Sequence, residues 1–193
     1  MCIRDRHRGE SDSPSAIILK NNNLHIEILK DSRAFAAQQD YAGISDIILE
    51  SAVSTICDNE DSVAAVDSRD KIICYRNWLG LMKSDLKSEF EKDGKLFERR
   101  LNPNRSYISK DGKGLKLHGR SLLLIRNVGH LMTNSSIILS DGSEIPEGIM
   151  DAFFTTAAAL HDQKKRNNSR TGSIYIVKPV SYTHLRAHET YPH

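Results

Sequence analysis

Three short and almost wholly apolar runs stand far apart along this chain, at residues 55–57, 121–125 and 173–177. A run without polar alternation is typical of a parallel strand that is covered on both faces. Stretches with helical periodicity lie between these runs, and such alternation of strand and helix predicts an α/β fold. At 193 residues the chain is long enough to bury a sizeable core.

Apolar residues recur at helical spacing in three stretches, at residues 40–56, 68–83 and 147–164. Pro146 suits the first position of the last helix, because its missing N–H has no partner there in any case. Trp78 lies beside the apolar stripe of the second helix, and we expect it to pack rather than to bind a ligand.

Short β-rich runs separated by turn residues predict antiparallel strands as well. Residues 16–20 and 24–29 form a strand–turn–strand pattern, and Asp141 and Gly142 mark a hairpin turn. Between residues 95 and 116, three short strands alternate with two turns. We interpret this last part as an antiparallel meander inserted into the α/β pattern.

The two ends of the chain do not fit this pattern. Residues 1–10 are charged without apolar periodicity, and residues 181–193 are polar and unpatterned. The histidines in these ends lack the spacing of metal ligands. We therefore interpret both ends as non-native tails resembling adapter-derived sequence, rather than as a metal-binding tail, and leave them out of the fold prediction.

Composition excludes several classes of protein. Lys plus Arg is 27 and Asp plus Glu is 25, so the net charge is only +2 and gives no reason to expect nucleic acid or a membrane surface as a partner. The chain contains no run of about 18 apolar residues, the length that a membrane-spanning helix needs. The three cysteines form no CxxC pair and follow no secretory signal, which indicates reduced thiols in a cytoplasmic protein.

Polar residues follow the apolar strands where those strands end. Asp58, Glu60 and Asp61 come after the first strand, and Arg126 ends the second. Because parallel strands share one edge at their carboxyl ends, these side chains could converge on one pocket. An arginine suits an oxyanionic substrate and clustered carboxylates suit Mg²⁺, but a loop-capping cluster with a structural salt bridge remains open.

The basic residues of the meander also have two interpretations. Arg99, Arg100 and Arg105 could hold phosphates, or they could form the exposed face of antiparallel strands. No Gly-rich phosphate loop accompanies them, and no other short catalytic motif occurs in the chain.

Several long stretches carry a family resemblance. The chain resembles malate synthase, isoform G, over about residues 11–180, through the motifs NNNLHIEI, CDNEDSVAAVDSRDK, YRNWLGLMK, RRLNPNRSY, GRSLLLIRNVGHLMTN, PEGIMDAF and NSRTGSIYIVKP. The family is much longer than this chain, so the resemblance implies an internal fragment. It implies a partial TIM (β/α)8 barrel together with part of an inserted α/β domain.

This resemblance implies a domain layout. Residues 11–50 would belong to the inserted domain, residues 51–83 to a barrel strand and helix, residues 84–120 to the meander of the inserted domain, and residues 121–180 to barrel strands and a helix.

The activity implied is a Claisen-type condensation in the glyoxylate bypass. Acetyl-CoA, glyoxylate and water would give (S)-malate and CoA, with Mg²⁺ as the cofactor. We expect the two substrates as partners, with no nucleic acid and no membrane, and a monomeric parent protein in the cytoplasm.

Site residues follow from the motifs one by one. Arg126 in RNVGHLMT resembles the family's active-site arginine, which contacts glyoxylate and stabilises the enolate. Ser62 and Arg99 match positions that contact acetyl-CoA. Asp58 and Glu60 match acidic positions near the metal, which would act through its waters.

The family's direct metal ligands and its catalytic Asp base lie beyond the last residue that resembles the family. We therefore expect the isolated chain to be inactive. The alternative is a stand-alone binding module for a CoA-type nucleotide, without catalysis.

Overall fold

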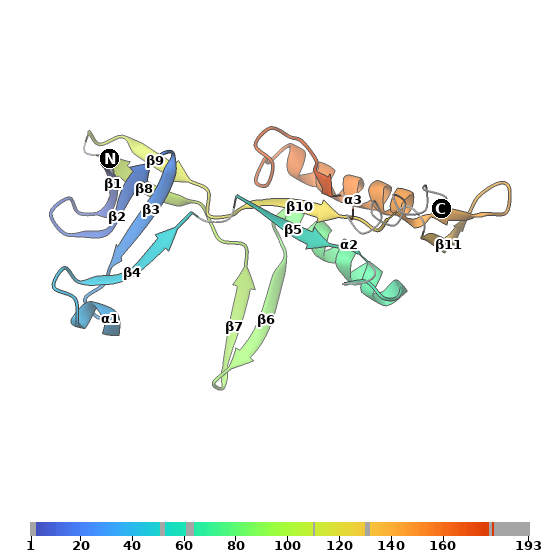
Figure 1. Ribbon diagram of the computed structural model, residues 1–193. Coiled ribbons are helices and arrows are strands. Elements are labelled where there is room, and N and C mark those ends of the chain that lie inside the picture. Colours follow the sequence, from blue (N-terminus) through green and yellow to red (C-terminus); the bar gives the residue numbers. More distant parts are fainter. Residues whose placement is uncertain are drawn as a thin grey trace, which may run out of the picture. The chain divides into compact units, whose positions relative to one another are not determined.

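A computed structural model of the chain describes residues 3–50, 53–60, 64–109, 111–129, 132–177 and 179. The chain divides into two compact units (Figure 1). The first unit comprises Met1–Val53 and Asn102–Arg120, and the second comprises Ser54–Leu101 and Ser121–His193.

The first unit is an antiparallel sheet. Its six strands follow the order β4-β3-β2-β1-β8-β9, with bounds β1 Ile3–Gly9, β2 Pro14–Asn21, β3 Leu24–Lys30, β4 Ile44–Leu49, β8 Arg105–Ser109 and β9 Gly114–Leu117. A short helix, α1, spans Phe35–Gln38. Asn22 and Asn23 both have positive φ and make the β2–β3 turn, as asparagine does readily. The strand–turn–strand prediction for this region is confirmed.

A small core and a buried ion pair hold this sheet together. Ile18, Tyr107 and Leu117 form the apolar cluster. Glu27 is only 2% exposed and pairs with the guanidinium of Arg105. Arg105 therefore neutralises a buried carboxylate within the sheet, which favours a structural role over phosphate binding.

Two predictions for this unit are wrong. Residues 1–10 were left out of the fold, but β1 pairs with β2 on one side and with β8 on the other. A strand between two neighbours gains backbone hydrogen bonds on both sides, so it forms without apolar periodicity. Whether this segment is native sequence stays a prediction.

The second wrong prediction is the helix over residues 40–56. Within this stretch, Ile44–Leu49 form strand β4, which pairs antiparallel with β3. Ile44, Ile47 and Ile48 have helical spacing, but β-branched side chains fit a strand as well, and β3 offers a row of backbone partners.

The second unit contains the parallel strands. The sheet order is β13-β10-β5, with bounds β5 Ser54–Asp58, β10 Leu122–Arg126 and β13 Ile176–Val177, and both pairings are parallel. The helices are α2 Ser68–Lys83 and α3 Glu147–Gln163. Two hairpins complete the unit, β6 Lys87–Lys92 with β7 Lys95–Arg100 and β11 Thr133–Ile138 with β12 Glu144–Pro146. The predictions of a parallel sheet, of these two helices and of the hairpin at Asp141 are confirmed.

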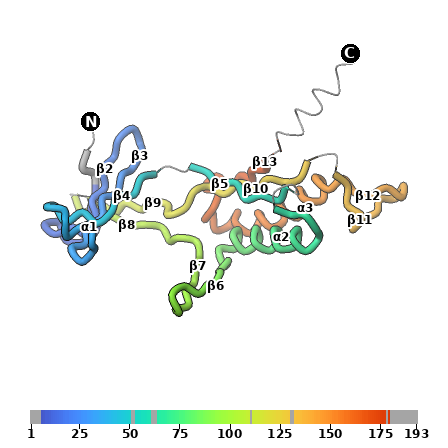
Figure 2. The backbone as a smooth tube through the Cα atoms, turned by 60° about the horizontal axis from the view of Figure 1, so that its bottom comes forward, coloured from blue at the N-terminus to red at the C-terminus, as the bar shows by residue number. Residues whose placement is uncertain are grey.

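Helices α2 and α3 lie side by side against the sheet (Figure 2). Asp67 caps α2, because its side chain accepts a hydrogen bond from the Asp70 backbone N–H at 2.9 Å. Trp78 and Met82 of α2 pack against Ile125 of β10 and two alanines of α3. The prediction that Trp78 packs is confirmed.

Residues 84–120 do not form one meander. Strands β6 and β7 make a separate two-stranded sheet in the second unit, whereas β8 and β9 complete the sheet of the first. Pro103 lies between the two pairs and has no N–H with which to continue a ladder.

The described residues contain three parallel strands and no closed barrel, so the α/β class is confirmed at this coarser level. None of the helices within the described ranges is both long and apolar enough to cross a membrane.

Candidate functional site

The parallel register makes Asp58 and Arg126 direct neighbours at the carboxyl ends of β5 and β10. Arg126 Nε donates to Asp58 Oδ1 at 2.9 Å, and Arg126 Nη2 donates to Asp58 Oδ2 at 2.5 Å. This is the two-pronged geometry for which guanidinium and carboxylate are matched. The structure thus brings together the two strand-end residues that the sequence placed at one edge.

The loop after β5 supports this pair. Asn59 N–H donates to the Arg126 carbonyl oxygen at 2.8 Å, and Glu60 N–H donates to Asp58 Oδ1 at 3.0 Å. Glu60 itself is buried. The strand ends therefore carry one cation and two carboxylates within a small, ordered region.

Each member of the pair stabilises the charged form of the other. The hydrogen bond to Asp58 raises the pKa of Arg126, and the charges of Asp58 and Glu60 act in the same direction. Burial works toward a higher pKa for Asp58, but the hydrogen bonds from Arg126 and from the Glu60 N–H outweigh it and lower that pKa. Both groups stay ionised at neutral pH.

This lowered pKa predicts a pH-dependent contribution to stability. The Asp58–Arg126 pair should stabilise the fold fully above about pH 4, the ordinary Asp pKa, and lose its contribution as the pH falls through the lowered folded value. Urea denaturation of Asp58→Asn and of the wild type should therefore differ most at pH 7 and converge at low pH. A difference between the two proteins that grows on acidification would contradict this expectation.

Three further predicted residues need separate treatment. Asp61 and Ser62 lie outside the described residues. Arg99 lies on β7, in the separate two-stranded sheet, with its Cζ 4.7 Å from the centroid of the Phe90 ring. The structure therefore leaves the proposed contacts of Ser62 and Arg99 with acetyl-CoA as proposals.

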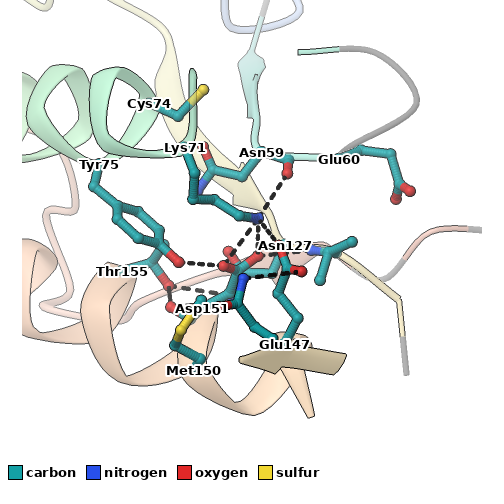
Figure 3. Close-up of polar contacts among 12 residues, drawn as sticks. Asn59, Glu60, Lys71, Cys74, Tyr75, Asn127, Glu147, Met150, Asp151 and Thr155 are labelled. Atoms are coloured by element: carbon teal, nitrogen blue, oxygen red, sulfur yellow. Dashed lines mark hydrogen bonds and ion pairs between the residues drawn. The ribbon is translucent and has the colours of Figure 1, made fainter. Parts of the chain in front are cut away.

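A buried charged cluster near the strand ends was missed from the sequence (Figure 3). Lys71 Nζ of α2 lies 2.7 Å from Glu147 Oε1 and 3.1 Å from Asp151 Oδ1, both on α3. The Tyr75 hydroxyl donates to Asp151, whose side chain is fully buried. These residues stand in three of the resembling motifs, but their separation of up to 80 positions gave no local spacing to detect.

Electrostatics keep this lysine charged. Burial is the largest single effect and would lower the pKa of Lys71, but hydrogen bonds and attraction from Glu147 and Asp151 together raise it. Burial and the hydrogen bond to Asp151 also raise the pKa of Tyr75, so its hydroxyl stays protonated and donates.

Close backbone contact joins the first turn of α3 to the loop after β10. A Cβ on Gly148 would lie 2.9 Å from the Val128 carbonyl oxygen and 3.4 Å from that of Gly129. Gly148→Ala should therefore lower the unfolding free energy by about 1–3 kcal/mol, because the backbone of the helix or of the loop must shift to make room for the new Cβ. Urea denaturation would measure this loss. Gly114→Ala is the matched control, since nothing lies within 4 Å of its Cβ; equal stability of the two variants would contradict the close contact.

Two of the described carboxylates suit a magnesium ion through its bound waters. No group of three His, Cys, Asp or Glu side chains suited to a metal occurs within the described part of the chain. Both oxygens of Asp58 accept hydrogen bonds from Arg126. Hard carboxylate oxygens near such an ion suit its bound waters, so Asp58 and Glu60 are compatible with an outer-sphere role.

A known domain family matches the C-terminal part of the chain. Residues 122–190 match the family described as "Malate synthase, TIM barrel domain", a range that contains β10, Arg126 and α3. The matched range runs into residues 181–190 of the predicted tail, and the boundary at residue 180 stays a prediction.

Three relatives that match a longer part of the chain are all named malate synthase G. Malate synthase G of Corynebacterium glutamicum is 53% identical over 185 residues, covering 93% of this chain and 25% of that protein. Malate synthase G of Corynebacterium efficiens is 53% identical, and that of Halalkalibacterium halodurans is 49% identical, each over 90% of this chain and 24% of the relative.

The resemblance to malate synthase G is thereby confirmed over most of the chain. The chain spans about a quarter of the length of the curated relatives that it matches.

Proposed function

We propose that this chain is a segment of a malate synthase, an acyltransferase that condenses acetyl-CoA with glyoxylate and water to give (S)-malate and CoA. The observation that carries the proposal is the Arg126 guanidinium, held by Asp58 at the end of a parallel strand in a segment similar to malate synthase G. Strand carboxyl ends are where TIM barrels build their sites.

Arg126 would act through its permanent charge. The Nε–H and one Nη2 N–H bond to Asp58, and the other N–H groups of the five would bind the ligand. They suit the carboxylate and the aldehyde oxygen of glyoxylate, and they suit the enolate oxygen that forms when acetyl-CoA loses a proton. One such donor typically lowers a barrier by about 3 kcal/mol.

Asp58 would orient this guanidinium rather than react itself. Its two hydrogen bonds fix the plane of the guanidinium, so no reorganisation is needed when negative charge develops. Asp58 and Glu60 would also receive waters of a magnesium ion. When bound, that ion supplies Lewis-acid polarisation of the aldehyde carbonyl.

Acetyl-CoA is proposed to contact Ser62 and Arg99. The support for Arg99 is its motif together with its exposure on β7, where the guanidinium is open to a phosphate or a carbonyl. For Ser62 the support is the motif alone.

The test is a coenzyme A release assay on the full-length protein that contains this segment. We expect free thiol to appear only when acetyl-CoA, glyoxylate and Mg²⁺ are all present, and (S)-malate to accumulate in equal amount. The isolated 193-residue chain should release none, because the family resemblance places the base and the direct metal ligands elsewhere. A full-length protein that hydrolyses acetyl-CoA equally well without glyoxylate would refute the proposal.

A further inference from the structure

We propose that Lys71 is a positioning residue for this reaction, because it ties together the two loops that follow Asp58 and Arg126. The proposal rests on the proposed function for its kinetic consequence. Its structural part stands on the contacts of the described residues alone.

Lys71 is unusually well placed to join separate elements. It lies on α2 and is 6% exposed, yet its ammonium contacts oxygens from two other parts of the chain. These are Glu147 Oε1 at 2.7 Å and Asp151 Oδ1 at 3.1 Å on α3, and the Asn59 carbonyl oxygen at 3.3 Å after β5. Figure 3 shows these contacts meeting at the one ammonium.

The contact with Asn59 leads to the first strand end. Asn59 follows Asp58 directly, and its N–H donates to the Arg126 carbonyl oxygen at 2.8 Å. The Asn59 peptide groups therefore connect Lys71 on one side with Arg126 on the other. A shift of Asn59 would move Asp58, and with it the two hydrogen bonds that orient the guanidinium.

The contact with Asp151 leads to the second strand end. Asp151 Oδ2 accepts the Val128 N–H at 2.9 Å, two residues after Arg126. Asn127 Nδ2 donates to Thr155 Oγ1 at 3.1 Å, and that hydroxyl donates in turn to the Asp151 carbonyl oxygen. One ammonium thus fixes both loops at once.

Removing the charge would leave two buried carboxylates without their shared cation. Glu147 and Asp151 both lie within 3.2 Å of Lys71 Nζ, so their repulsion would become uncompensated in a region of low dielectric. The carboxylates would separate, and the Val128 N–H and the Asn59 carbonyl would lose their fixed partners.

The test compares Lys71→Met with Met82→Ala in the full-length protein. Met82 lies in the core of the same unit, is 1% exposed, and packs with Trp78, Ile125, Ala158 and Ala159, none of which belongs to the charged cluster. Met82→Ala should therefore lower stability without removing a contact of the two loops. Two quantities are measured: kcat and KM with both substrates, and hydrogen–deuterium exchange of peptides that cover residues 58–60 and 126–129.

We expect Lys71→Met to lower kcat by about 100-fold, the usual effect of a displacement near 1 Å, with the KM for acetyl-CoA within about threefold. Amide exchange in the two loops should accelerate at least tenfold. Lys71→Arg should recover part of both effects, and Met82→Ala should change only the melting temperature. If Lys71→Met keeps wild-type kcat and wild-type loop exchange, the proposal is wrong.

Tyr75→Phe gives a milder test if Lys71→Met does not fold. It removes one hydrogen bond to Asp151 and should raise exchange in the 126–129 peptide and lower kcat by a few fold; no change in either refutes the proposal. If loop exchange is faster in the variants than in the wild type but the wild type does not condense glyoxylate, the proposed function fails while the positioning of the loops stands.

Discussion

Replacing Arg126 by alanine in the full-length protein should lower kcat for malate formation by about 10²–10³-fold. The lost donor accounts for about 3 kcal/mol of the barrier, which is roughly two powers of ten in rate. The Asp58 carboxylate would also lose its counter-charge and would repel the enolate, which adds to the loss. Steady-state assays of CoA release would measure this change.

Two further variants separate charge from geometry. Arg126→Lys keeps the positive charge but loses the fork, so its kcat should lie between those of the wild type and of the alanine variant. Arg33→Ala is the matched control, because Arg33 pairs with Asp31 on the surface and its side chain is 89% exposed. Wild-type kcat in Arg126→Ala would show that this guanidinium does not take part in the chemistry.

Trp78→Ala should have the largest effect on stability, a loss of about 4 kcal/mol of unfolding free energy. Trp78 is 2% exposed, packs at the centre of the cluster between α2, α3 and β10, and donates from Nε1 to the Thr155 carbonyl oxygen at 2.9 Å. The change would leave a large cavity and remove this link between the helices. Since domains have only about 5–15 kcal/mol to lose, the second unit would be close to unfolding.

Urea denaturation followed by circular dichroism is the suitable measurement, because Trp78 is the only tryptophan of the chain and fluorescence would lose its probe. Ile72→Ala on the same helix is the control. Its side chain is 56% exposed, so the expected loss stays below about 1 kcal/mol. Similar losses in the two variants would mean that Trp78 is not at the centre of this core.

The sequence was informative where local pattern and tertiary structure agree. Helix α2 has apolar periodicity and an Asp cap, and the apolar run at residues 121–125 became strand β10. The pairing of Asp58 with Arg126 followed from a general property of parallel strands, whose carboxyl ends share an edge. Neither residue needed to be near the other in the chain.

Elsewhere the outcome depended on pairing partners outside the segment itself. Strand β4 formed where helical spacing was present, because β3 offered backbone hydrogen bonds along its edge. Strand β1 formed without any apolar pattern, because β2 on one side and β8 on the other both offer it backbone hydrogen bonds.

The cluster around Lys71 was missed for a different reason. A charged residue in a sequence is read as exposed by default. Only the packing of α2 on α3 shows that Lys71 and Asp151, 80 positions apart, are buried together.

The structure of the full-length protein with glyoxylate and Mg²⁺ would test the proposed role of Arg126 most directly. We predict a carboxylate or aldehyde oxygen of glyoxylate about 3 Å from the Arg126 guanidinium, on the side that Asp58 leaves open, with Asp58 and Glu60 facing waters of the metal. Glyoxylate bound away from the ends of β5 and β10, or an Arg126 side chain turned away from it, would contradict the assignment.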